Sequence, residues 1–314
     1  MMYISGACVM FLSLVQGVFT IADDGAGLTV FENDKPVLTY QYQPGELPDR
    51  VGERYRRSGY VHPLYGLDGE VMTQDFPLDH FHHRGVFWAW PDSTLGEKKV
   101  DIWALDGARQ VHAGWIEKRA DENQAVIAAV NNWVLDDAPD APIIREEVKI
   151  VVHTSSDTSR NIDFDLTFTN VADEEFVLRG SGTDNKGYGG FCLRPDATRK
   201  PFTFASLAGV STDEDVTDEA LPSPWVDVSF AREAGADTVS GVAIFQHPGN
   251  PGYPHPGWIL RHYGFLGQSW PHIHPYPMQP GVSLRLRYCL HVHRGDADAA
   301  AVAAAFQDYE EEMK

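Results

Sequence analysis

Apolar and polar residues alternate, with few exceptions, through three stretches of the chain, residues 144–152, 162–168 and 284–292. Alternation with a period of two places the apolar side chains on one face of a β-strand, so each stretch predicts a half-buried strand. Turn-forming pairs such as Pro44-Gly45 and Pro280-Gly281 separate such stretches. Further strands are expected at residues 27–32, 37–42, 124–135, 225–231 and 238–246. The pattern predicts a mostly β protein built as a large antiparallel β-sandwich.

The end of the chain has a different pattern. Residues 296–313 are rich in alanine, and Asp296 and Asp298 near their start suit the positive end of a helix. A short C-terminal helix is therefore expected there. No repeat, linker or break in composition divides the chain, so residues 18–314 are expected to form one domain.

The charge balance limits the partners. The chain of 314 residues has 45 acidic and 25 basic side chains, a net charge of −20. Such a surface repels phosphate backbones and anionic lipids, so neither nucleic acid nor a membrane is an expected partner. No G-x-G-x-x-G or P-loop motif is present, and no nucleotide cofactor is expected. A small-molecule or oligosaccharide substrate fits better, and the sequence indicates no particular protein partner.

Residues 1–17 differ from the rest of the chain. Residues 7–14 are mostly apolar, and no charge appears before Asp23. A secretory signal peptide is the favoured interpretation, which predicts a periplasmic or extracellular protein; a buried first strand in a cytoplasmic protein is the alternative. Removing such a leader leaves Cys192 and Cys289. Two thiols define no disulfide framework, and whether they pair stays open.

The most concentrated set of functional residue types is the stretch DHFHHRGVFWAW at residues 79–90. Imidazoles can ligate a metal or move a proton, arginine can hold an anionic oxygen, and tryptophan offers a flat apolar face. If the stretch is extended, His80 and His82 share a face with Arg84, and His83 lies on the other. A metal site would need a third ligand, for which the candidates are Asp79, Glu146, His272 and His274. An ordinary turn with hydrogen-bonded polar residues is the alternative.

Glu146 lies on the apolar face of the strand expected at residues 144–152. An inward carboxylate is costly unless it is paired or neutralised, so its pKa is expected to rise, as suits a general acid or base. The alternative is an internal salt bridge to an arginine such as Arg84.

Two further regions are candidates for a site. The glycine-rich segment 184–191 carries Lys186 and Tyr188, which could donate to a substrate oxygen; a plain turn is the alternative. Residues 247–272 combine prolines, histidines and aromatic rings with polar tips, as in the lining of a sugar cleft.

Long motifs in the sequence resemble the DUF6807 family, which has carried a "methane oxygenase PmoA" label. The motifs are HPLYG at 62–66 through DHFHHRG at 79–85, KGYGGF at 186–191 and YGFLGQSWP at 263–271. A membrane oxygenase subunit needs several spans of about 20 apolar residues, and none is present. The family is similar to galactose-mutarotase-like supersandwich proteins, a group with mutarotases and polysaccharide lyases. That resemblance implies a sugar held against a concave sheet.

These observations predict a carbohydrate-active enzyme that acts on a glycoside or keto-sugar by acid–base chemistry, as a hydrolase, lyase or epimerase. The expected catalytic residues are His82, His83, Glu146 and Lys186. The expected substrate-binding residues are Arg84, Trp88, Tyr188, His247, His262, Trp270 and His272. One alternative is a metal-dependent hydrolase or lyase with His80 and His82 as ligands. The other is a sugar-binding protein without catalysis.

Overall fold

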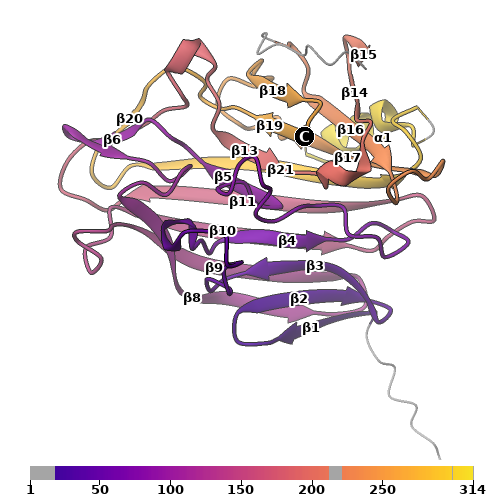
Figure 1. Cartoon of the computed structure of the whole chain (residues 1–314), viewed down its shortest axis with the longest axis horizontal. Helices are drawn as coiled ribbons and strands as arrows, with labels where there is room; N and C mark the ends of the chain where they lie inside the picture. The colour runs from indigo at the N-terminus through magenta and orange to yellow at the C-terminus, as the bar shows by residue number, and fades with distance from the viewer. Residues whose placement is uncertain (1–17, 212–220, 299, 314) are drawn as a thin grey trace, which may run out of the picture.

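The alternating stretches form the long strands of two packed antiparallel sheets in the computed structural model, which describes residues 18–211, 221–298 and 300–313 (Figure 1). One sheet has eight strands, and their order begins at the N-terminus of the described chain. In that order they are β1 (Phe19–Asp23), β2 (Gly27–Glu32), β3 (Lys35–Gln41), β4 (Tyr60–Leu64), β5 (Val86–Ala89), β13 (Gly190–Leu193), β19 (Phe265–Gln268) and β18 (Trp258–Arg261).

The other large sheet has nine strands, and it contains the three stretches with the strictest alternation. Its order is β15 (Gly209–Ser211), β14 (Thr203–Ser206), β16 (Trp225–Ala231), β17 (Val239–Gln246), β21 (Ser283–Arg294), β11 (Ser159–Asn170), β10 (Ile144–His153), β9 (Gln124–Leu135) and β8 (Ala108–Ala120). A small four-stranded sheet has the order β20 (Tyr276–Met278), β12 (Phe176–Leu178), β6 (Ser93–Leu95) and β7 (Lys98–Val100).

The predicted mostly β sandwich is confirmed, and each strand expected from the sequence is present within a few residues. The expected C-terminal helix is shorter than predicted. Helix α1 covers Val302–Glu312, because Ala301 has a left-handed backbone with a φ of 50° that a continuous helix does not allow. Short 3₁₀ turns lie at Glu53–Tyr55, Thr183–Asn185 and Ala197–Arg199.

Large aromatic side chains fill the space between the two main sheets. Trp88 of β5 packs against Phe164 of β11 with ring centres 6.2 Å apart, and Phe191 of β13 stacks on Tyr288 of β21 at 4.6 Å. Since side chains alternate across a sheet, these inward residues leave every second side chain of the same strands on the outer faces.

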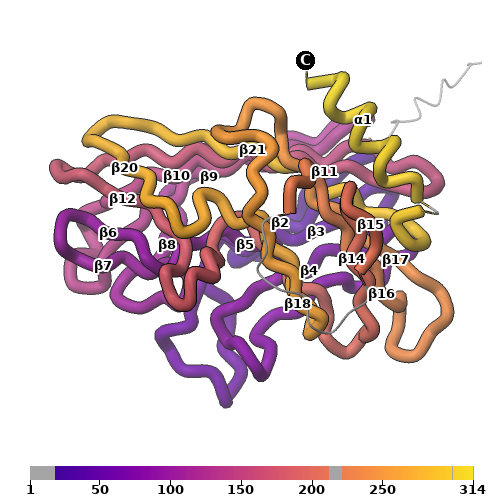
Figure 2. The backbone as a smooth tube through the Cα atoms, turned by 90° about the horizontal axis from the view of Figure 1, so that it is seen from above, coloured from indigo at the N-terminus to yellow at the C-terminus, as the bar shows by residue number. Residues whose placement is uncertain are grey.

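Helix α1 covers part of the outer face of the nine-stranded sheet (Figure 2). Phe306 and Tyr309 of the helix contact Phe245 of β17, with ring centres 5.4 and 5.7 Å apart. Cys289 of β21 belongs to the apolar cluster beneath helix α1, whereas Cys192 lies in the eight-stranded sheet. Both thiols are free and buried, so the open question of a disulfide between them is answered in the negative.

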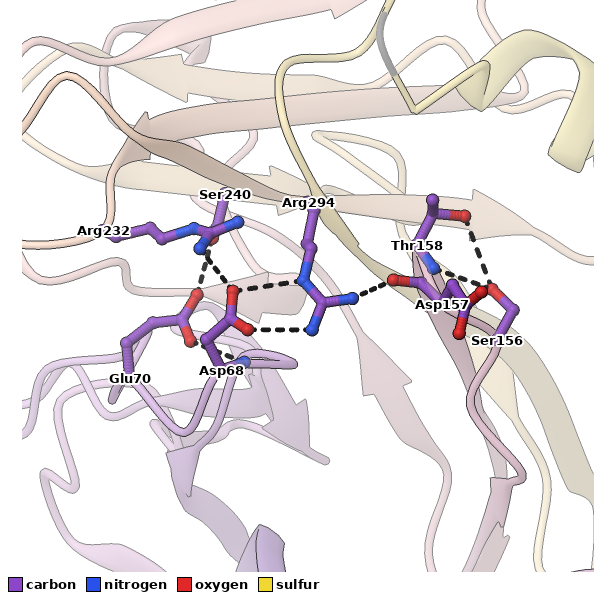
Figure 3. Close-up of polar contacts among 8 residues, drawn as sticks. All are labelled: Asp68, Glu70, Ser156, Asp157, Thr158, Arg232, Ser240 and Arg294. Carbon is purple, nitrogen blue, oxygen red and sulfur yellow. Dashed lines mark hydrogen bonds and ion pairs between the residues drawn. The ribbon is translucent and has the colours of Figure 1, made fainter.

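A cluster of charges fastens the loop between β4 and β5 to the nine-stranded sheet (Figure 3). Asp68 binds Arg294 through two hydrogen bonds of 3.1 and 2.8 Å and also pairs with Arg232. Glu70 of the same loop accepts a hydrogen bond from Ser240 of β17. The cluster ties together parts of the chain that lie more than 200 residues apart.

Two expectations from the sequence concern export and membranes. The expected leader, residues 1–17, lies outside the described residues, so export stays a prediction. Within the described part of the chain, no helix has the length and apolar character required to cross a bilayer.

Candidate functional site

The outer face of the eight-stranded sheet carries a pocket. Because Trp88 of β5 points between the sheets, its neighbour Phe87 points outward, where Trp103 packs on it with ring centres 5.3 Å apart. A pocket of about 510 Å³ opens beside this pair. Its walls come from the turn at residues 80–83, from residues 91–92 and 99–104, from the segment 181–188, and from residues 259–265 of β18, β19 and their connection.

Three histidines form one wall of this pocket. The stretch at residues 79–84 is a turn, closed by a hydrogen bond of 2.9 Å from the His83 amide to the His80 carbonyl, and β5 begins only at Val86. The His80 and His83 rings stack 4.5 Å apart and almost parallel, and the His82 ring stands edge-on to His83 at 4.6 Å. The face assignment that assumed an extended stretch is therefore wrong, since the turn brings all three imidazoles to the pocket.

The two inner imidazoles are uncharged at neutral pH. Burial lowers the pKa of His82 to about 3, with further contributions from the charges of His80 and nearby arginines. Burial also lowers the pKa of His83 far below its usual value. The buried Nδ1 of His83 has no hydrogen-bond partner among the described residues. Placing the ring proton on Nε2 avoids a buried donor without an acceptor, and that N–H is then left for a ligand.

The glycine-rich segment forms a second wall, as the sequence predicted. Tyr188 packs beside Trp103 with ring centres 5.2 Å apart, and Lys186 lies 3.4 Å from Asp184. Gly187 has a φ of +66°, and a Cβ added there would lie 2.1 Å from the His272 ring. Only glycine fits this close approach, which brings the neighbours Lys186 and Tyr188 to the pocket.

Sequence reasoning missed a carboxylate pair in the third wall. Asp101 is only 5% exposed and accepts a hydrogen bond of 2.8 Å from the Ala104 amide. Lys99 lies between Asp101 and Asp92, with its Nζ 3.5 Å from a carboxylate oxygen of each. Burial raises the pKa of Asp101 above its usual value, although the Ala104 amide and Lys99 oppose the shift. No alternation or histidine cluster marks residues 99–104, so no sequence signal pointed to them.

Glu146 does not reach the pocket. The predicted inward carboxylate is confirmed, since Glu146 is fully buried between the sheets and burial raises its pKa. It accepts hydrogen bonds from Gln110, Asn131 and Trp133 at 3.1, 2.8 and 2.6 Å, and it has no arginine partner among the described residues. Through these hydrogen bonds Glu146 links its own strand, β10, to β8 and β9.

Replacing Glu146 with glutamine should destabilise the protein by about 1–3 kcal/mol, because the amide would turn an N–H toward neighbours that are themselves donors. Chemical denaturation would measure this loss. Ligand binding in the pocket should be unchanged in the folded variant, and weakened binding would contradict the assignment of Glu146 to the core.

Arg84 also lies outside the pocket lining. It is fully buried, donates to Asp75 at 3.1 Å and to the Tyr55 carbonyl, and stacks on the Phe76 ring 3.4 Å from its centre. Its guanidinium is therefore committed to protein groups rather than open to a substrate.

Five other predicted binding residues do not line the pocket. Trp88 is in the core, and buried Trp270 donates through Nε1 to the Pro251 carbonyl at 2.9 Å. His262 stands edge-on to Phe204, and His247 lies beside Tyr309 of α1. The His272 ring packs against Gly187.

Of the expected catalytic and substrate-binding residues, the structure thus brings together His82, His83, Lys186 and Tyr188 at the pocket. Within the described residues, no three histidine, cysteine or acidic side chains are grouped so that they could hold a metal ion.

A pocket lined by aromatic and polar side chains on a β-sandwich is the kind of cavity in which small molecules commonly bind, and it is the candidate site of this chain. The sequence profile of DUF6807, a family of unknown function, matches residues 28–307, and the chain belongs to this family. No curated protein sequence matches it.

Several solved structures are similar to the chain. A mutant of the heparan sulfate lyase HepC from Pedobacter heparinus has 11% identity and a TM-score of 0.39, covering 93% of this chain and 38% of the lyase. Galactose 1-epimerase from Lactobacillus acidophilus NCFM has 10% identity and a TM-score of 0.39, covering 88% and 98%. A putative aldose 1-epimerase from Escherichia coli K12 has 10% identity and a TM-score of 0.31, covering 88% and 99%. The chain thus spans about two fifths of the lyase and nearly all of each epimerase.

Proposed function

We propose that the protein is a carbohydrate-active enzyme that acts on a glycoside or keto-sugar by acid–base chemistry in this pocket. The observation that carries the proposal is the joint lining of one cavity of about 510 Å³ by aromatic rings, uncharged imidazoles and a buried carboxyl group of raised pKa. The cavity has the size of a small-molecule site, and its walls combine aromatic rings with many polar and charged side chains.

The aromatic walls suit a sugar ring. Trp103 and Tyr188 pack together with ring centres 5.2 Å apart, and Tyr263 stacks on His80 with ring centres 5.5 Å apart. The apolar face of a pyranose packs on such rings, while phenol and imidazole tips bind its hydroxyl groups.

The polar groups divide into two roles. In this proposal Asp101, whose pKa is raised by burial, acts as the general acid: it donates a proton to a leaving or carbonyl oxygen and later regains one from water or a hydroxyl group. Asp92 supplies a second carboxylate, and Lys99 holds both. His82 has too low a pKa to carry the proton well, so it serves as a neutral hydrogen-bond partner for a sugar oxygen.

Incubating the protein with a panel of glycosides and 3-keto-glycosides, followed by NMR, would reveal hydrolysis, elimination or epimerisation by its own signals. We expect turnover of at least one compound, and a loss of at least about tenfold in kcat/KM for His82→Asn, since one hydrogen bond to the substrate is lost.

The matched control is His153→Asn, which removes a half-exposed histidine paired with Asp163 far from the pocket lining. It should retain wild-type turnover. Tight sugar binding without any product would identify a binding protein instead, and absence of both binding and product across the panel would refute the proposal.

A further inference from the structure

A buried arginine without an acidic partner stands behind the histidine wall. Arg57 is 3% exposed, and its guanidinium donates to the carbonyl oxygens of His82, Ile102 and Trp103. It lies over the Phe87 ring, 5.2 Å from the ring centre. Arg57 thus connects the two turns that carry the imidazoles and the buried carboxyl group.

The neighbouring buried arginines differ from Arg57 in one respect. Arg84 pairs with Asp75 at 3.1 Å, and Arg194 pairs with Asp79 at 2.9 Å. Arg57 forms no ion pair with any carboxylate of the described residues, and its buried Nε has no hydrogen-bond partner there. A buried charge of this kind is costly unless something of opposite charge compensates it.

Arg57 remains charged under physiological conditions. Burial, followed by the charge of Arg84, lowers its pKa to about 9, and Tyr60 and Asp101 oppose this shift without forming an ion pair with it. The guanidinium is therefore still protonated at neutral pH. Its charge reaches the histidine wall, since it is among the causes that lower the pKa of both His82 and His83.

The groups in front of Arg57 are suited to an anion. His82 and His83 carry no charge of their own, and each can turn one N–H toward a ligand oxygen. Lys186 and Arg261 line the same pocket, although the chain as a whole has a net charge of −20. The same lining contains Lys99 with the carboxylates of Asp92 and Asp101, and Lys186 pairs with Asp184. The unpaired positive charge at the pocket is therefore that of the buried Arg57 rather than a property of the lining as a whole.

We infer that the sugar bound here carries a carboxylate, as in a uronic acid, and that this carboxylate lies against His82 and His83 in front of Arg57. Two imidazole N–H groups match the two oxygens of a carboxylate, and a single negative charge compensates a single unpaired guanidinium. This inference rests on the proposed function and names the class of substrate for that pocket.

Calorimetric titration with matched sugars tests the inference. The probes are glucuronate, galacturonate and mannuronate, each with its neutral parent sugar, which differs only at the carboxylate. We expect at least one uronate to bind at least tenfold more tightly than its parent, and this preference to weaken as salt is added.

Two variants separate charge from structure. Arg57→Met should abolish the preference for the uronate, whereas Arg57→Lys, which keeps the charge, should retain most of it. Arg285→Met removes an exposed arginine that pairs with Asp165 on the nine-stranded sheet, and it should leave the preference unchanged. The comparison of sugars on the wild-type protein does not depend on the folding of any variant.

The outcomes distinguish this inference from the proposed function. Equal binding of each uronate and its parent sugar would overturn the inference and leave a sugar enzyme in place. A preference that survives in Arg57→Met would also overturn it, because another cation would then be responsible. Failure of all three uronates to bind would also overturn the inference, whereas the proposed function is refuted only if the panel of glycosides and 3-keto-glycosides is neither bound nor converted.

Discussion

Replacing Asp101 with asparagine should lower kcat by about 100-fold or more, with little change in KM. Asparagine has nearly the same shape and can still accept the hydrogen bond from the Ala104 amide, but its amide has no acidic proton to transfer to a substrate. General acid catalysis contributes about 10²–10⁴-fold in rate, which sets the size of the expected loss. Steady-state kinetics on the substrate found in the panel would measure it.

The pH dependence of kcat/KM tests the role of Asp101 independently. Because burial raises the pKa of Asp101, the protonated form persists to higher pH than in an exposed aspartate. Wild-type kcat/KM should therefore fall as the pH rises through that pKa, and this limb should be absent in the Asp101→Asn variant.

Asp137→Asn is the matched control for Asp101→Asn, since Asp137 is also an aspartate bound to a lysine, Lys98, but is exposed and outside the pocket. Normal turnover in Asp101→Asn, or an equal loss in Asp137→Asn, would remove Asp101 from the reaction.

Arg84→Met should lower the free energy of unfolding by about 3–5 kcal/mol. Arg84 is fully buried, and methionine would leave the Asp75 carboxylate without its cation and the Tyr55 carbonyl without its donor. Removing one member of a buried pair has an effect of this order, because the remaining charge is uncompensated. Urea denaturation followed by tryptophan fluorescence would measure the change.

Arg285→Met provides the comparison for the same chemical change at an exposed ion pair. Its partner is Asp165, and exposed pairs contribute about 0–1 kcal/mol. Similar losses in the two variants would show that the burial of Arg84 does not determine its contribution to stability.

The fold could be predicted because its strands carry a local signal. In β10 and β11 every second residue is buried, so the sequence shows the period of the strand without any knowledge of its neighbours. The start of the C-terminal helix could not be predicted as well, since alanine content does not reveal the left-handed backbone at Ala301.

The site was only partly predictable because it depends on contacts between distant segments. The histidine turn and the segment with Lys186 and Tyr188 are rich in unusual residues, and both line the pocket. Asp101 is a candidate only because the fold buries it in the pocket lining, and no local sequence pattern indicates that burial. Conversely, Glu146 and Trp88 have the residue types of a site, but the strand register directs them into the core.

The position of β21 has a consequence for how the protein must be made. This last strand of the chain pairs with β11 on one side and with β17 on the other, so it completes the middle of the nine-stranded sheet. While a ribosome is still synthesising residues before Ser283, both of those neighbours present open edges that can pair with other chains. The nine-stranded sheet therefore cannot be completed until residues 283–294 have been synthesised and are free to pair with β11 and β17.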